Sequence, residues 1–231
     1  MIGRYPDRNT IFSKEPFVYV PSHFREQNTP GIIEFMHEHQ FATVVSVNDR
    51  VPIASHLPVE TFGDRPDALW LSGHMSRANP QWKSFDAGTE ILTIFHGPHT
   101  YISPTWYRGS AVPTWNYQSV HAYGNVELIS DGSELRALLT RLVERNEAGN
   151  DPADRYTLSS LSEEFLVNMM RGIVGFRVHV TRLEASSKLS QNRSDEDYQS
   201  IITELKGRTD DDSHRISAAM IARRPDMGQD A

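Results

Sequence analysis

The stretch SGHMSRANPQW at residues 72–82 carries side chains that could bind an anion. Arg77 offers a charged planar guanidinium and Ser76 a hydroxyl. Asn79 adds an amide at the expected start of a short helix, where free backbone N–H groups favour negative charge. These three side chains could surround a phosphate. The same residue types also fit a solvated loop in which Asn79 is only a helix cap, so the stretch alone leaves both interpretations open.

Two further segments could contact a flat ligand. In ASHLP (54–58), His56 could touch a ring system or ligate a metal, although a lone histidine in a strand is more often a hydrogen-bonded structural residue. In VPTWNYQSVHAYG (112–124), Trp115 and Tyr117 could stack on an aromatic ligand. They could equally anchor a dimer interface, because aromatic side chains are enriched in both settings.

The histidines invite a metal interpretation, which their spacing does not favour. Zinc needs three or four convergent ligands, whereas His96 and His99 flank Gly97-Pro98, a turn signal, and need not converge. A single histidine as the axial ligand of a haem is a smaller requirement and stays open. The chain has no cysteine, which excludes disulfides, iron–sulfur clusters and a cysteine nucleophile. It also lacks the glycine-rich nucleotide-binding, zincin and serine-hydrolase motifs.

Composition narrows the class of protein. The 231 residues include 23 basic and 30 acidic side chains, a net charge of −7, which argues against a broad nucleic-acid footprint. The first residues have no apolar signal-peptide core, and no window approaches 18 apolar residues. We therefore expect a cytoplasmic protein without a membrane span.

The elements that must position these residues are mostly strands. Alternating and β-branched patterns predict strands over 41–48, 51–60, 69–73, 89–97, 118–130 and 173–185. Helical periodicity and caps predict helices over 29–39, 79–86, 131–148, 159–171, 194–206 and 210–223. Asn48-Asp49 predicts a hairpin, and Pro52 and Pro58 place the second strand at a sheet edge or a bulge. Residues 98–117, rich in proline and aromatics, are expected to form a long functional loop.

This pattern predicts an antiparallel six-stranded β-barrel with added helices, an α+β fold, because the strand–helix–strand rhythm of a parallel sheet is missing early in the chain. Residues 1–16 are expected to form a flexible N-terminal arm. Residues 17–206 would be the barrel domain, with a helical insertion at about 131–171. Residues 207–231 would be a C-terminal helix and tail.

Several motifs together resemble the PaiB-type family, whose members are described as FMN-binding negative transcriptional regulators. The resemblance runs from about residue 18 to residue 206, and it rests on VYVPSHFRE (18–26), ASHLP (54–58), GHMSRANPQW (73–82), FHGPHTYISPTWY (95–107), VPTWNYQSVHAYG (112–124) and KLSQNRSDED (188–197). It implies an FMN-binding split barrel like that of the pyridoxamine-phosphate oxidases. In that fold two copies form a homodimer and share each cofactor site.

The resemblance also implies roles for particular residues. Residues 73–79, which include His74, would form the phosphate-binding turn, with Ser76, Arg77 and Asn79 on the phosphate. The strand 53–57 would line the isoalloxazine ring. The strand's implied contacts are Ser55, His56 and Leu57, and those from the partner subunit are Trp115, Asn116, Lys188 and Gln191.

Piperazate synthases, which are haem-dependent enzymes that close an N–N bond, are similar to PaiB-type proteins. A haem b interpretation would make His74 the first candidate for the axial ligand and His56 the second. Three functions follow from the resemblance: a flavin-dependent oxidoreductase or flavin-linked regulator, a haem enzyme of the piperazate-synthase type, and a non-catalytic transcriptional regulator. The acidic charge and the absence of a helix-turn-helix signature argue against DNA binding. His56, His74 and Tyr123 are candidates for a general base by location only.

Overall fold

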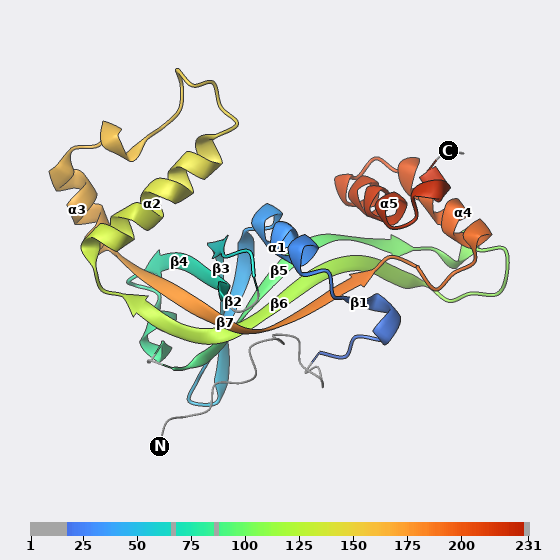
Figure 1. Cartoon of the computed structure of the whole chain (residues 1–231), viewed down its shortest axis with the longest axis horizontal. Helices are drawn as coiled ribbons and strands as arrows, with labels where there is room; N and C mark the ends of the chain where they lie inside the picture. The colour runs from blue at the N-terminus through green and yellow to red at the C-terminus, as the bar shows by residue number, and fades with distance from the viewer. Residues whose placement is uncertain (1–17, 66–67, 86–87, 229–231) are drawn as a thin grey trace. The chain divides into compact units, whose positions relative to one another are not determined.

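A computed structural model describes residues 18–65, 68–85 and 88–228, so the predicted N-terminal arm lies outside the described residues. The helices and strands follow one another along the chain as Figure 1 shows. The strands are β1 (Arg25–Glu26), β2 (Phe41–Asn48), β3 (Val51–Phe62), β4 (Trp70–Ser76), β5 (Glu90–Ile102), β6 (Thr114–Ile129) and β7 (Ile173–Lys188). The α-helices are α1 (Thr29–Glu38), α2 (Gly132–Glu147), α3 (Glu163–Arg171), α4 (Asp195–Lys206) and α5 (Asp211–Arg223). Short 3-10 helices add η3 (Pro80–Ser84) and η4 (Pro104–Trp106) near the candidate site residues.

Six long strands close into a barrel. Their order is β1-β7-β4-β3-β2-β5-β6, and an additional pairing of β7 with β6 closes the ring, with the two-residue β1 attached to β7. The pairs β2–β3, β2–β5, β3–β4 and β4–β7 are all antiparallel. The predicted six-stranded antiparallel barrel with helices is therefore confirmed. No helix within the described ranges is long and apolar enough to cross a membrane.

The β2–β3 hairpin turns at Asp49 and Arg50. Both residues have a positive φ, 50° and 67°, and they lie between the paired residues Asn48 and Val51. A two-residue loop with two positive φ angles has the backbone of a type I′ turn, whose twist matches that of the strands it joins. The hairpin predicted from Asn48-Asp49 is confirmed.

β3 is paired on both sides along only part of its length. Residues 51–58 pair with β2, whereas pairing with β4 begins at Val59 opposite Gly73 and ends at Phe62. Because the Val59 N–H bonds to the Gln40 carbonyl on the β2 side, alternation points the N–H and C=O groups of positions 52, 54, 56 and 58 to the open side. Pro52 and Pro58 have no N–H to leave unpaired there, which is why prolines are tolerated at this edge.

Two predictions about the central segments are wrong. The strand predicted to end at Gly73 continues to Ser76. The predicted loop 98–117 is strand at both of its ends, since β5 runs to Ile102 and β6 begins at Thr114, so the connection between the two strands covers only residues 103–113. Pro98 is buried within β5 and does not end it. Aromatic and β-branched side chains favour extended backbone, and here they outweigh the proline signal.

The described residues form two compact units. The first contains residues 36–65, 68–85, 88–95 and 121–183, and the second contains residues 18–35, 96–120 and 184–228. β5, β6 and β7 each contribute residues to both units. Consecutive stretches of one strand therefore belong to different units, and the predicted sequential domains stay a prediction.

In the first unit, four stacked side chains, two arginines and two aromatic rings, connect α2 to the sheet. The Arg141 guanidinium lies 5.0 Å from the Phe62 ring centre, and Phe62 stacks on Trp70 at 4.0 Å with an interplanar angle of 9°. Arg177 covers the other side of Trp70 at 5.1 Å, so a cation lies on each outer ring face. Gly175 on β7 lets the helix approach closely, because a Cβ there would lie 2.9 Å from Leu135 Cδ1. Figure 1 shows α2 with α3 in yellow to orange.

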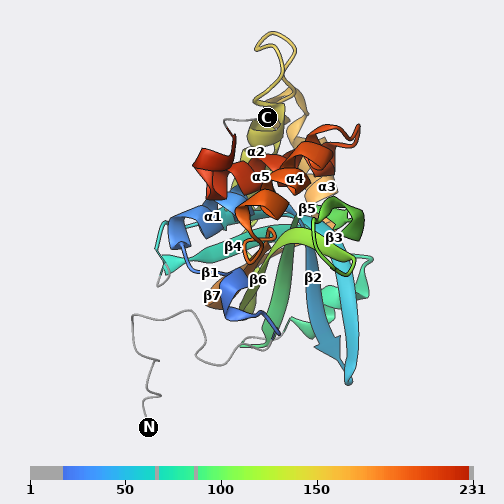
Figure 2. The ribbon, with the colours of Figure 1, turned by 90° about the vertical axis from the view of Figure 1, so that its right-hand side faces the viewer.

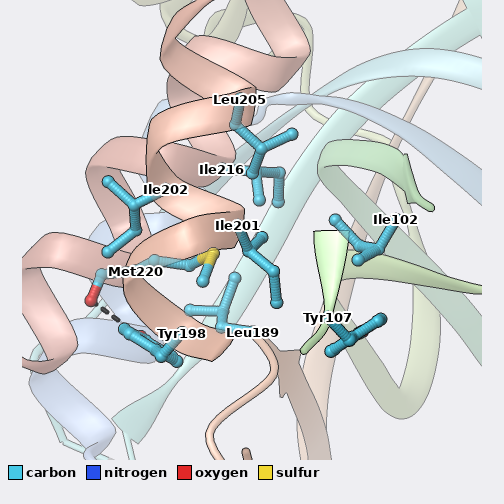
Figure 3. Close-up of a cluster of buried hydrophobic side chains, with 9 residues drawn as sticks. All are labelled: Ile102, Tyr107, Leu189, Tyr198, Ile201, Ile202, Leu205, Ile216 and Met220. Carbon is cyan, nitrogen blue, oxygen red and sulfur yellow. Dashed lines mark hydrogen bonds between the residues drawn. The ribbon is translucent and has the colours of Figure 1, made fainter. Parts of the chain in front are cut away.

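In the second unit, α4 and α5 pack side by side around their own core (Figure 2). Figure 3 shows the buried side chains that fill it, which are Ile102, Tyr107, Leu189, Tyr198, Ile201, Ile202, Leu205, Ile216 and Met220. The Tyr198 hydroxyl donates to the Met220 carbonyl at 2.8 Å, which satisfies the polar atom of a fully buried ring. This apolar cluster holds α5 in place without relying on surface ion pairs.

Candidate functional site

The first group of candidate residues lies where β3 and β4 separate. Pairing between the two strands stops at Val59 and Gly73, while His74 and Ser76 of β4 remain paired with Gly175 and Ile173 of β7. His74 and Ser76 point to the same face of the sheet because they are two residues apart. The split in the barrel therefore leaves one flank of β4 open beside the open edge of β3.

Arg77 follows directly after β4 and is held by the chain that enters β7. Its backbone N–H donates to the Gly172 carbonyl at 2.8 Å, and its Nε and Nη2 donate to the carbonyls of Arg171 and Ile173, each at 3.0 Å. The side chain is exposed, and Nη1 has no protein acceptor assigned among the described residues. Arg77 is thus a fixed cation that keeps N–H groups available for an anion.

The turn after Arg77 is also held in one conformation. The Ser76 hydroxyl accepts from the Ala78 N–H at 3.2 Å. Asn79 Oδ1 accepts from the Gln81 N–H at 3.0 Å, which confirms the predicted cap of η3, and its Nδ2 donates to the Ser55 hydroxyl at 2.8 Å across the split. Ser55 and Asn79 are therefore brought together. Asn79 uses both amide atoms within the protein, so Ser76 and Arg77 are the more available groups for a phosphate.

Gln81 is a supporting residue that the sequence did not single out. Its side chain is fully buried, and Nε2 donates to the carbonyls of Val44 at 3.0 Å and Ile53 at 3.2 Å. These contacts fix η3 against both strands of the β2–β3 hairpin. The only signal for this role in the sequence is the position of Gln81 two residues after a helix-capping asparagine. That position does not show whether the Gln81 amide is buried or exposed.

His74 has the properties of a ligand-facing imidazole. Its Nδ1 is buried without a hydrogen-bond partner among the described residues, although the side chain as a whole is half-buried. Burial lowers the pKa of His74 because it disfavours the charged ring. The imidazole is therefore neutral near pH 7, with a lone pair or an N–H directed to an unfilled contact, which suits either a polar edge of a flavin or a haem iron.

The lowered pKa of His74 predicts a pH dependence of stability. The unfolded chain protonates this histidine near pH ~6.5, whereas the folded protein resists protonation until a lower pH. The free energy of unfolding should therefore fall as the pH drops through this window, because the unfolded state binds the proton first. Urea unfolding at several pH values should show a shallower dependence for His74→Gln than for the wild-type protein. Equal slopes for the two proteins would contradict the prediction.

The β3 residues of the first group lie along the open edge. His56 is exposed and lies 6.4 Å from the Phe41 ring in an edge-on arrangement, while Ser55 and Leu57 point to the other face. Between the two prolines, the N–H groups of Ala54 and His56 face the open side. This edge can therefore present two donors and flanking carbonyls to a ligand with an alternating polar rim.

The second group of candidates lies in the second unit. Trp115 is 52% exposed on β6, and its ring lies 6.0 Å from Tyr101 and 6.2 Å from His99. These three rings form an exposed aromatic surface on neighbouring strands. Such a surface can stack on a flat ligand or pack against another chain.

Asn116 is a buried support. It is 0% exposed, its Oδ1 accepts from the Ser190 hydroxyl at 3.0 Å, and its Nδ2 lies 3.6 Å from Met220 Sδ. Ser190 has a φ of 59°, a left-handed conformation that costs about 1 kcal/mol for a residue with a Cβ. Asn116 therefore holds the turn after β7, and its direct contact with a cofactor stays a prediction.

Lys188 and Gln191 flank this turn. The Lys188 ammonium donates to the Thr114 hydroxyl and lies 5.7 Å from the Phe24 ring centre. Burial lowers the pKa of Lys188, and the neighbouring positive charge of Arg193 lowers it further. Gln191 closes the turn on itself, since its Oε1 accepts from the Leu189 N–H at 2.7 Å and its Nε2 donates to the Ser187 carbonyl at 2.6 Å.

The structure thus gathers the candidates into two groups. The first group combines a candidate anion site, a polar strand edge and a neutral histidine. The second combines an aromatic surface with a half-buried cation. No cluster of three or more metal-ligating side chains occurs in the part of the chain that the structure describes.

Comparison with known proteins assigns most of this chain to one family model. Residues 18–182 match the model described as "Putative FMN-binding domain". Over 203 residues the chain is 37% identical to "Protease synthase and sporulation protein PAI 2" of Bacillus subtilis (strain 168), and this match covers 88% of this chain and 96% of the relative.

Solved structures with the same fold are more distant in sequence. The flavocytochrome Anf3 of Azotobacter vinelandii is 16% identical with a TM-score of 0.57, and the match covers 78% of each chain. A FAD and haem binding protein of Mycobacterium smegmatis is 18% identical with a TM-score of 0.56, covering 75% of this chain and 78% of the other. At this identity the likeness establishes the split-barrel fold alone.

Proposed function

Because this chain belongs to the PaiB-type FMN-binding domain family, we propose that it binds FMN at the split between β3 and β4 and uses it as a flavin-dependent oxidoreductase. The observation that carries the proposal is the combination at this split. A fixed arginine and an exposed serine lie at the end of β4, beside an open strand edge with polar backbone groups. An isoalloxazine ring has a polar rim of alternating donors and acceptors, and its ribityl chain ends in a phosphate.

The named residues would divide the cofactor between them. Ser76 and the free N–H groups of Arg77 would bind the phosphate through charge-assisted hydrogen bonds. The backbone groups of Ala54 and His56 would face the rim of the ring, while Asn79 and Ser55 keep the two sides of the split at a fixed separation. His74 would stay neutral because burial lowers its pKa, so it can donate or accept one hydrogen bond without adding charge. FMN, when bound, supplies hydride and electron transfer.

A homodimer would complete the site. On the outer face of the hairpin, Phe41 is 67% exposed and Val47 58% exposed, and both share this face with Ala54 and His56. Large exposed apolar side chains on adjacent strands are typical of an interface. The proposal is that a second copy covers this face and brings its own Trp115 and Lys188 towards the ring.

An absorbance spectrum of the purified protein tests the proposal. We expect a yellow protein, or saturable binding of added FMN that quenches flavin fluorescence, together with a dimer in light scattering. A colourless protein that does not respond to FMN would overturn the cofactor assignment, and a monomer would overturn the shared site. A Soret band that disappears in His74→Ala would instead establish haem ligation by this residue.

A further inference from the structure

The turn that follows β7 is held by a side chain from the far end of the chain. Arg224, the C-cap residue that directly follows α5, donates through Nη2 to the carbonyl of Gln191 at 2.8 Å and to that of Arg193 at 3.3 Å. Its Nη1 donates to Asp195 at 2.8 Å. One guanidinium therefore binds two backbone carbonyls of the turn and the first residue of α4.

Arg224 is itself held in place by the Tyr198 ring. Its guanidinium carbon lies 4.3 Å from the ring centre of Tyr198, and the Tyr198 hydroxyl donates to the carbonyl of Met220 on the preceding turn of α5. Figure 3 shows this hydroxyl and carbonyl within the apolar cluster. The flat guanidinium lies over an aromatic ring while its N–H groups point to acceptors in its plane, a geometry that lysine cannot reproduce.

The turn is strained where Arg224 holds it. Ser190 has a positive φ, and its hydroxyl is bound by the buried Asn116. A left-handed residue with a side chain persists only where its surroundings enforce the conformation. Asn116 acts on the turn from β6 and Arg224 acts on it from α5, so the conformation of the turn depends on both contacts.

The strand end next to this turn carries Lys188. Its ammonium is half-buried and directed to the Thr114 hydroxyl at the start of β6. Because Lys188 is three residues before Gln191, a shift of the turn would move the last residues of β7 and the direction of this ammonium. The position of the cation is thus coupled to the C-terminal helices.

We propose that Arg224 is a positioning residue for the segment Lys188–Asn192, which contains the implied cofactor contacts Lys188 and Gln191, so that the helical pair α4–α5 presets this segment for FMN bound by a partner subunit. The inference rests on the proposed function and extends it to a residue outside every motif of the sequence. Arg224 has no direct contact with the cofactor in this proposal. It acts by restricting the conformation of the turn before FMN binds. The turn then loses less conformational entropy on binding, so less of the binding free energy is spent on ordering it.

The chain provides a matched control. Arg223 is on the same turn of α5 and forms an ion pair with Glu26 at 3.0 Å, so Arg223→Ala removes the same charge from the same helix end. The apolar cluster of α4 and α5 is intact in both variants, and we expect both to fold. Arg224→Lys keeps the charge but loses the planar fork.

The experiment compares FMN affinity and hydrogen exchange in the full-length variants. For Arg224→Ala we expect about tenfold weaker FMN binding, since charge-assisted hydrogen bonds to the turn are lost. Backbone amides over residues 189–193 of the cofactor-free protein should exchange faster. Added guanidinium ion should restore part of the affinity of Arg224→Ala, and Arg224→Lys should resemble the alanine variant. Arg223→Ala should retain wild-type affinity and wild-type exchange in the turn.

The experiment distinguishes failure of the proposed FMN binding from failure of the proposed role of Arg224. If wild-type protein does not bind FMN, the proposed function fails and this inference fails with it. If wild-type protein binds FMN and Arg224→Ala binds it equally well with unchanged exchange, the inference alone is overturned. A loss of affinity of the same size in Arg223→Ala would also overturn it, because the effect would then reflect charge at the helix end.

Discussion

Arg77→Ala is expected to weaken FMN binding by about 1–3 kcal/mol, which corresponds to a dissociation constant roughly 5–150 times higher. Among the described residues at the end of β4, Arg77 is the side chain that would offer a permanent positive charge to the phosphate, and the variant loses it. It also loses the bonds from Nε and Nη2 to the carbonyls of Arg171 and Ile173, so the turn before Asn79 is less restrained. Quenching of flavin fluorescence during titration measures the change.

Lys83→Ala is the matched control for Arg77→Ala. Lys83 is an exposed cation on η3, six residues from Arg77, and its removal changes the net charge of the protein equally. We expect the affinity of this variant for FMN to remain within about twofold of wild type, since Lys83 lies outside the proposed phosphate-binding turn and exposed charges are screened by salt. Equal affinities for wild type and Arg77→Ala would place the phosphate elsewhere.

Ile201→Ala is expected to lower the free energy of unfolding of the second unit by about 2–5 kcal/mol. Ile201 is 0% exposed in the cluster between α4 and α5, and its replacement leaves a cavity that neighbouring rings cannot fill. Chemical denaturation followed by circular dichroism should show an earlier transition. Tryptophan fluorescence can report the second unit through Trp106 and Trp115.

Glu204→Ala on the same helix provides the comparison for Ile201→Ala. Glu204 is exposed, and alanine has a higher helix propensity, so the free energy of unfolding should change by less than about 0.5 kcal/mol. A small loss for Ile201→Ala would mean that the cluster collapses around the substitution and that α4 is not held by this packing.

The sequence predicted the elements that carry periodic patterns. The α1, α4 and α5 boundaries agree with the predicted helices to within one residue, and Asn79 caps η3 as expected. The hairpin at Asn48-Asp49 and the barrel class also followed from local patterns. The helices, the cap and the hairpin depend on the spacing of residue types along the chain, which can be read directly from the sequence.

What the sequence missed depends on contacts between distant residues. The buried amide of Gln81 and the guanidinium of Arg224 each satisfy backbone carbonyls tens of residues away, and neither lies in a recognisable pattern. Asn116 was expected to approach a ligand, and the sequence did not indicate that its Oδ1 also accepts from the Ser190 hydroxyl. Residue type indicates that a group can form hydrogen bonds, but only the fold determines where those bonds go.

The prolines at positions 52 and 58 also bear on the resistance of the protein to aggregation. A free strand edge of this length can recruit a strand from another chain, which is a route to aggregation. Along residues 52–58 an incoming strand would find only two backbone N–H donors, those of Ala54 and His56, and a proline without an N–H lies at each end of this pair. A short flat molecule can be satisfied by so few donors, whereas a polypeptide cannot extend a ladder from them. The same edge therefore admits a small ligand and discourages the growth of fibres.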